Sequence, residues 1–171
     1  MGLDMYLYKT KHFSSLHKEY DENGRPKYKR FKSGAAIIKR TTEDGKEIEE
    51  VMRIENPDES LKIKQIVLYW RKANAIHKWF VDNVQDGEDN CGEYSVCLDQ
   101  LKELLELCKK IKDNPNEAPQ LLPTQDGFFF GSTEYDETYM DDIEYTIKRL
   151  EEIIKTSENE QDSWFTYSSS W

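Results

Sequence analysis

The sequence predicts an α+β fold in a single domain of residues 1–171, with an antiparallel sheet covered by about three helices. The length is close to that of one ordinary domain and leaves little room for a second core. Strand-like segments are grouped rather than alternating regularly with helices, which disfavours a doubly wound parallel sheet. Helical periodicity is strongest in three stretches, at about 71–84, 98–112 and 134–155.

The first half of the chain supplies most of the expected strands. Residues 1–9 alternate Leu3, Met5 and Leu7 with polar or tyrosine side chains, the period of a half-buried strand. Residues 9–32 are polar and basic and predict an irregular excursion. Residues 35–40 and 47–54 are β-compatible, and Asp44-Gly45 between them favours a hairpin turn at 41–46. Basic residues are interleaved with aromatic or aliphatic ones in KYKRFK (27–32) and IIKR (37–40), a pattern seen on nucleic-acid-binding surfaces. We favour a solvated strand face balanced by the acidic partner strand.

The middle of the chain predicts a strand followed by two helices. Residues 62–70 lead as an extended apolar segment into the first helix, where Ala73, Ile76, Phe80 and Val84 form one stripe. Residues 85–94 predict a flexible acidic loop. The second helix opens after Cys97, a weak cap that Gln100 could complete, and carries a stripe of leucines ending at Cys108.

The last third predicts one more helix between two short strands. Residues 127–131 (GFFFG) are expected to form a compact aromatic strand, and Ser132 or Thr133 to cap the helix that follows. Residues 164–167 read as a terminal strand, placed beside the N-terminal strand, and Trp171 is expected to pack.

Composition narrows the classes of function. With 24 basic and 34 acidic residues the formal charge is −10, which disfavours broad binding to a nucleic-acid backbone. No apolar run is long enough to span a bilayer, and no secretory signal is recognisable, so we expect a cytoplasmic protein without a membrane partner. The three cysteines lack paired spacing and are expected to be free thiols. Neither a metal nor a cofactor is predicted.

Two stretches combine aromatic surface with groups that can bind an anion. A ring, an amide and an imidazole follow one flank of the first helix beside two basic residues, and the glycine-bounded turn before the last helix offers hydroxyl groups. If these stretches converge, they predict a site for a planar anionic ligand. The candidate ligand-binding residues are Trp70, Arg71, Asn74, His77, Lys78, Ser132, Thr133 and Tyr135. The alternative for each stretch is structural, with His77 a hydrogen-bonded boundary residue and the turn a helix cap.

Four blocks of the sequence resemble a family of small, mostly uncharacterised proteins encoded by phages and prophages. The blocks are MGLDMYLY, YWRKANAIHKWF, CGEY and LLPTQDGFFFGSTEYDETYMDDIEYTI. The resemblance implies an accessory protein in a bacterial cytoplasm and assigns no catalytic residue. It also implies that the hairpin excursion at 25–56 is variable.

Three classes of function stay open at this stage. The first is a non-enzymatic binder of a nucleotide-type ligand, acting as a sponge for a host immune signal. The second is an acidic inhibitor that contacts a host or DNA-binding protein. The third is a small enzyme that uses His77, for which neither a nucleophile nor a metal set is recognisable.

Overall fold

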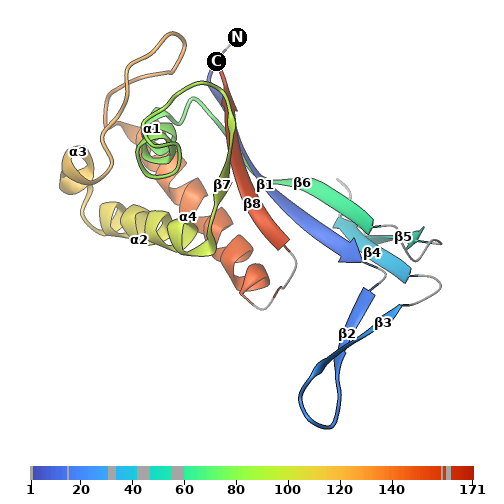
Figure 1. Cartoon of the computed structure of the whole chain (residues 1–171). Coiled ribbons are helices and arrows are strands. Elements are labelled where there is room, and N and C mark those ends of the chain that lie inside the picture. Colours follow the sequence, from blue (N-terminus) through green and yellow to red (C-terminus); the bar gives the residue numbers. More distant parts are fainter. Residues whose placement is uncertain are drawn as a thin grey trace. The chain divides into compact units, whose positions relative to one another are not determined.

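The chain contains an antiparallel sheet with helices on one face, which confirms the predicted α+β class. Figure 1 shows a computed structural model that describes residues 2–14, 16–30, 34–41, 47–54, 60–158, 160 and 163–171. These residues group into two compact units, one of residues 1–10 and 64–171 and the other of residues 11–63.

The first unit is built on a four-stranded sheet in the order β6-β1-β8-β7. The strands are β1 (Asp4–Ser14), β6 (Ser60–Arg71), β7 (Glu93–Val96) and β8 (Ser163–Ser170). The terminal strand predicted at 164–167 is therefore confirmed, and it lies beside β1 as expected. β7 was not predicted, because its four residues continue directly from an acidic loop and show no apolar alternation.

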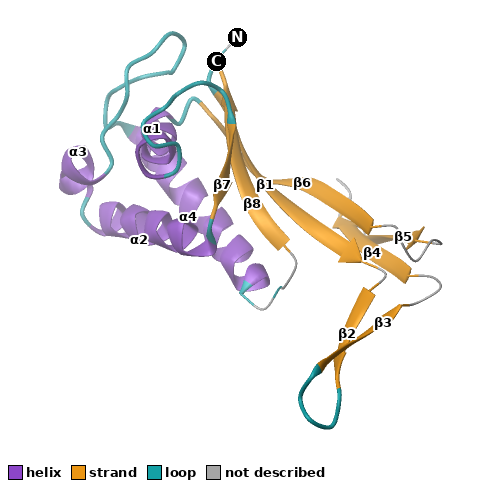
Figure 2. Cartoon of the chain, viewed as in Figure 1, coloured by secondary structure: helices purple, strands orange, loops and turns teal. Residues whose placement is uncertain are grey.

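The helices lie together on one face of this sheet (Figure 2). They are α1 (Asn74–Asn83), α2 (Leu98–Asp113), α3 (Ala118–Leu121) and α4 (Glu137–Ser157), with a 3₁₀ turn at Pro115–Glu117. Each of the three predicted helices is present. α1 begins three residues later than expected because β6 continues to Arg71 and Lys72 adopts a left-handed φ of 61°.

The caps show how the sequence fixes the helix starts. The Cys97 thiol accepts a hydrogen bond from the backbone N–H of Gln100 at 3.4 Å, and the Gln100 side chain accepts one from the Cys97 N–H at 2.9 Å. The capping box is complete despite the cysteine. α4 is capped by Asp136, whose carboxylate accepts from the N–H of Tyr139, so the predicted cap at Ser132 or Thr133 is wrong.

The core fills the space between the sheet and the helices. Leu3, Met5 and Leu7 are fully buried, as the alternation in β1 predicted. Phe80 from α1 stacks on Tyr167 from β8 at 3.9 Å between ring centroids. The predicted stripe of α1 is buried at Ala73, Ile76 and Phe80.

Residues 127–131 form a turn and not the predicted strand. Phe129 has a φ of 65° and Gly131 a φ of 97°, both in the left-handed region that extended strands do not use. Phe130 alone of the three consecutive phenylalanines is buried. The aromatic run indicated a strand by composition, whereas its two bounding glycines were the better indicators of a turn.

The second unit consists of two hairpins and the strand ends that lead to them. β2 (Leu16–Tyr20) pairs antiparallel with β3 (Pro26–Arg30), so the irregular excursion expected at 9–32 is wrong. The turn between them is closed by Asp21, whose carboxylate accepts from the N–H groups of Asn23 and Arg25 at 2.9 and 2.8 Å.

The hairpin predicted at 35–54 is confirmed, but it is a separate two-stranded sheet rather than part of the main one. β4 (Gly34–Thr41) pairs with β5 (Glu47–Ile54), and Lys39 lies opposite Glu49 in the register. Most of the turn expected at 41–46 lies outside the described residues, which resume at Glu47.

The two units differ sharply in charge. Residues 11–63 contain 12 basic and 11 acidic residues, whereas residues 1–10 and 64–171 contain 12 basic and 23 acidic ones. The helical unit, at −11, therefore carries all of the protein's net negative charge. Within the described part of the chain, no helix has the length and apolar character needed to cross a membrane.

Candidate functional site

Trp70, the first of the predicted ligand residues, is part of the core. Its side chain is 2% exposed, and the indole N–H donates to the Thr146 hydroxyl on α4 at 2.9 Å. The ring also packs edge-on against Phe80. With its face covered and its N–H satisfied, Trp70 holds α4 against β6.

Asn74 is 4% exposed and joins α1 to the turn that precedes α4. Its amide N–H groups donate to the carbonyl oxygens of Phe130 and Ser132, at 3.2 and 2.8 Å. Its carbonyl oxygen accepts from the N–H of Gln125 at 3.1 Å. The structure thus brings together the two predicted stretches at Asn74 and Ser132, and the side-chain NH2 of Asn74 is used in joining them.

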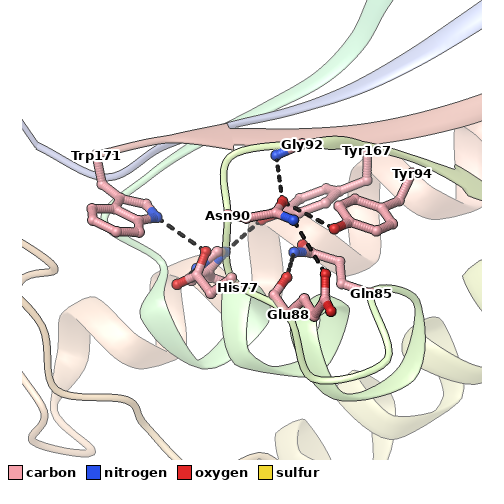
Figure 3. Close-up of polar contacts among 9 residues, drawn as sticks. His77, Gln85, Glu88, Asn90, Gly92, Tyr94, Tyr167 and Trp171 are labelled. Carbon is pink, nitrogen blue, oxygen red and sulfur yellow. Dashed lines mark hydrogen bonds and ion pairs between the residues drawn. The ribbon is translucent and has the colours of Figure 1, made fainter.

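His77 is completely buried at the centre of a polar network drawn in Figure 3. Its Nδ1 lies 2.7 Å from the Tyr167 hydroxyl, and its Nε2 lies 3.0 Å from a carboxylate oxygen of Asp89. The indole of Trp171 donates to the other oxygen of Asp89 at 3.0 Å. Trp171 thus packs on the network, as the sequence predicted.

The hydrogen-bond partners of His77 indicate which of its ring nitrogens carries a hydrogen. Burial and the nearby Asp89 carboxylate raise the pKa of Tyr167 well above its usual value, so the phenol stays neutral and can donate to Nδ1. When the phenol donates to Nδ1, Nε2 carries the hydrogen and donates to Asp89. An Asp–His–hydroxyl chain resembles a nucleophile with its base, but the Tyr167 side chain is 0% exposed and out of reach of a substrate.

The loop predicted at 85–94 carries a second set of hydrogen bonds beside the His77 contacts, and its last residues belong to β7. The side chain of Asn90 accepts from the N–H of Gly92 and from the hydroxyl of Tyr94, both at 2.9 Å (Figure 3). Gln85 donates to the carbonyl of Glu88. The prediction missed these bonds because Asn and Gly indicate a turn but do not show which groups close it.

The other predicted ligand residues lie nearer the surface. Arg71 is exposed, and Lys78 pairs with Asp82 at 2.7 Å one helical turn away. The carbonyl of Thr133 accepts from the Thr124 hydroxyl at 3.0 Å. Tyr135 is 39% exposed, and its hydroxyl accepts from the Thr124 N–H. These contacts stabilise the turn and leave the two basic residues unconnected to it in any described hydrogen bond or ion pair.

A depression lies where α1 and α4 begin, with a cavity volume of about 30 Å³, enough for about one water molecule. Asn74 and Ser132 line it, but the remaining six predicted ligand residues do not. Three carboxylates from the start of α4 also line it, those of Glu134, Asp136 and Asp142. An anion entering here would meet negative charge before any basic side chain.

One of these carboxyl groups, that of Asp142, has a raised pKa. Burial raises its pKa to about 7, with further contributions from Asp141 and Asp136. The start of α1, which lines the same depression, has neither a capping side chain nor an acidic residue in its first turn and carries a partial positive charge. The pKa of Asp142 is raised nevertheless. A carboxyl group perturbed in this way marks a candidate functional position.

The first turns of α4 and the residues before them carry more acid than the fold neutralises. Residues 134–144 contain six acidic residues and no basic one. Glu144 pairs with Lys112 at 3.0 Å. In the described part of the chain, the other five make no ion pair with a basic side chain. We call these five the acidic surface: Glu134, Asp136, Glu137, Asp141 and Asp142.

Sequence reasoning did not single out this surface. Asp142 lies three residues after Tyr139 and one before Ile143, both on the buried stripe of α4, and that spacing was a usable sign of a half-buried carboxylate. Phe128 and Phe129 are 81% and 51% exposed, and their exposure was not predicted because a strand was expected there.

Other chemistries find little support in the described residues. Cys91 and Cys97 are exposed, Cys108 is buried, and all three are free thiols. No group of three or more His, Cys, Asp or Glu side chains within the described ranges is arranged to hold a metal ion.

Comparisons with known proteins assign no family to the chain. No protein-family model matches the sequence, and neither a curated protein nor a solved structure matches significantly. The resemblance to phage and prophage proteins therefore stays a prediction.

Proposed function

We propose that this protein is a non-enzymatic binding protein whose acidic surface covers a basic surface of another protein. The observation that carries the proposal is the set of five carboxylates at the start of α4 without a basic partner among the described residues. Burial, with smaller contributions from Asp141 and Asp136, raises the pKa of Asp142, and lysine or arginine side chains from outside would compensate the negative charge there. A nucleic-acid-binding protein offers such a surface.

The charge distribution supports the same proposal. The helical unit carries −11, so its field attracts a basic partner and accelerates encounter at low salt. In the setting implied by the sequence resemblance, the protein would act in a bacterial cytoplasm as an inhibitor that occludes a host or DNA-binding protein.

The nucleotide-sponge hypothesis is the weaker candidate. It needs stacking rings and basic groups around a cavity, whereas Trp70 and His77 are buried and satisfied and the depression is lined by acids. It stays a prediction that a thermal-shift measurement with a panel of nucleotides can test, since a bound nucleotide would raise the melting temperature.

The main test uses a fluorescent peptide rich in lysine and arginine as probe. The variant Glu134→Gln/Asp136→Asn/Asp141→Asn should bind it about tenfold more weakly than the wild type, with a smaller dependence on salt. Asparagine at 136 retains the helix cap. A control with the same change of charge is Asp99→Asn/Glu103→Gln/Glu106→Gln on α2.

The control isolates position from total charge. α2 begins beside the end of α4, where Lys102 pairs with Glu158, so the control residues lie away from the depression. Equal weakening in the two variants would show that only net charge matters, and the proposed surface would be wrong.

A further inference from the structure

The turn before α4 presents two phenylalanine side chains to solvent. Phe128 is 81% exposed and Phe129 51% exposed, with their ring centroids 4.2 Å apart. We call this pair the phenylalanine tip. Phe130 points the other way, is 4% exposed, and packs edge-on against His77 and Trp171.

The turn that carries the tip is firmly held. Asn74 bonds both Phe130 and Ser132, and Thr124 bonds Thr133. A Cβ on Gly127 would lie 2.6 Å from the Phe130 ring, so only glycine fits there. These contacts fix the direction of the tip.

The backbone at the tip is strained in a way that exposes the rings. Phe129 has a φ of 65°, a conformation that bulky residues rarely adopt. Glycine or asparagine would be the ordinary choice at such a position. A strained, well-anchored residue that ends in solvent is typical of a binding element.

The charge around the tip restricts the partner that it fits. Asp126 precedes the tip, and Glu134 and Asp136 follow it on the acidic surface, while Lys72 lies beside Gly131 at the base of the turn. The helical unit at −11 would be repelled by an anionic lipid surface. A protein surface with basic groups around an apolar pocket satisfies both the rings and the acids.

We propose that the phenylalanine tip is the anchor of the interface, inserting into an apolar pocket that is framed by lysine and arginine side chains on the partner protein. This inference rests on the proposed function and adds to it that the partner's basic surface surrounds an apolar pocket. The acidic surface attracts and orients the partner, and the tip supplies the desolvated centre of the contact.

The test selects ligands from a library of random peptides displayed on phage, with the full-length protein immobilised. Enriched peptides should combine basic with aliphatic or aromatic residues. They should bind Phe128→Ser/Phe129→Asn at least about tenfold more weakly than the wild type. Asparagine accepts the left-handed conformation at 129, so the variant should fold, and circular dichroism checks that it does.

A matched control removes two exposed apolar side chains elsewhere. Ile66 on β6 and Tyr145 on α4 are 52% and 42% exposed, and Ile66→Thr/Tyr145→Ser should leave peptide binding unchanged. Equal losses in this variant and the tip variant would overturn the inference.

The remaining outcomes separate the two proposals. Peptides that are basic and sensitive to the acidic-surface variant, but indifferent to loss of the tip, would overturn the anchor and leave the proposed function standing. Enrichment without basic residues would overturn both. A dimer in analytical ultracentrifugation that the tip variant abolishes would assign the tip to a second copy of this chain, and binding to anionic vesicles would assign it to lipid; either result would overturn the inference.

Discussion

The flank of α1 and the start of α4 are both rich in aromatic and polar side chains, yet these side chains lie in opposite environments. On the α1 flank, Trp70, Asn74 and His77 are buried and each polar group has a partner. At the start of α4, burial and the neighbouring carboxylates raise the pKa of Asp142, and in the turn before it the rings of Phe128 and Phe129 face water. Residue type suggested the first region as a binding site, whereas unsatisfied chemistry points to the second.

We call the buried flank of α1 the closed side, and the start of α4 with the turn before it the open side. Substitutions on the closed side should destabilise the fold, most of all at its apolar centre. Phe80→Ala should lower the free energy of unfolding by about 3–5 kcal/mol, because Phe80 is fully buried and stacks on Tyr167. Denaturant titration measures the loss. Arg71→Ala, at an exposed position, should change it by less than about 1 kcal/mol, and comparable losses would mean that Arg71 belongs to the structure.

A smaller loss is expected where the closed side holds the turn. Asn74→Ala leaves the Phe130 and Ser132 carbonyls and the Gln125 N–H without their partner, which should cost about 2–4 kcal/mol. Chemical denaturation gives the value. Asn83→Ala, which removes one bond to the Trp79 carbonyl near the end of α1, is the control and should cost about 1 kcal/mol or less. If Asn74→Ala were as mild as the control, the turn would be held by other contacts.

The smallest effect is expected on the open side, where substitution of Asp142 should raise the free energy of unfolding instead of lowering it. The pKa of Asp142 is about 7 in the folded protein and about 4 when unfolded, so between these values the folded state binds more protons. Stability from this group is therefore present at low pH and lost as pH rises through 7. Asp142→Asn should stabilise the protein by about 1–2 kcal/mol at pH about 8, allowing for its partial exposure.

Thermal melts at pH about 5.5 and 8 provide the measurement. The wild type should lose stability between these two values, and Asp142→Asn should lose less. A wild type whose melting temperature rises over this range by the same amount as that of the variant would show that Asp142 is ionised without penalty, and the open side would then be as well satisfied as the closed one.

The sequence predicted the periodic helices and strands well, but it predicted poorly which distant segments pair with one another. The stripes of α1, α2 and α4 and the alternation in β1 depend only on local spacing, and these elements are present. The main sheet could not be read in the same way. The 35–54 hairpin forms a separate sheet, whereas residues 93–96 join the main one. Which sheet a segment joins is set by pairing between distant segments.

The candidate site shows the same limit. The ligand hypothesis required the two stretches to converge, and the structure joins them at Asn74 and Ser132. The sequence could not show that His77 would be enclosed by Tyr167 and Asp89. Nor could it separate the three consecutive phenylalanines into one buried and two exposed rings, because that division is made by the left-handed backbone at Phe129.

The pairing of β1 with β8 at the centre of the sheet has a consequence for how the protein is made. Residues near positions 4–10 must find partners near 163–170, so the contacts that complete the sheet span almost the whole chain. Such non-local pairing slows folding, because a large loop must close before any of its contacts form. During synthesis the helices can form early, while the edge of β1 that pairs with β8 has no partner strand until residues 163–170 have left the ribosome.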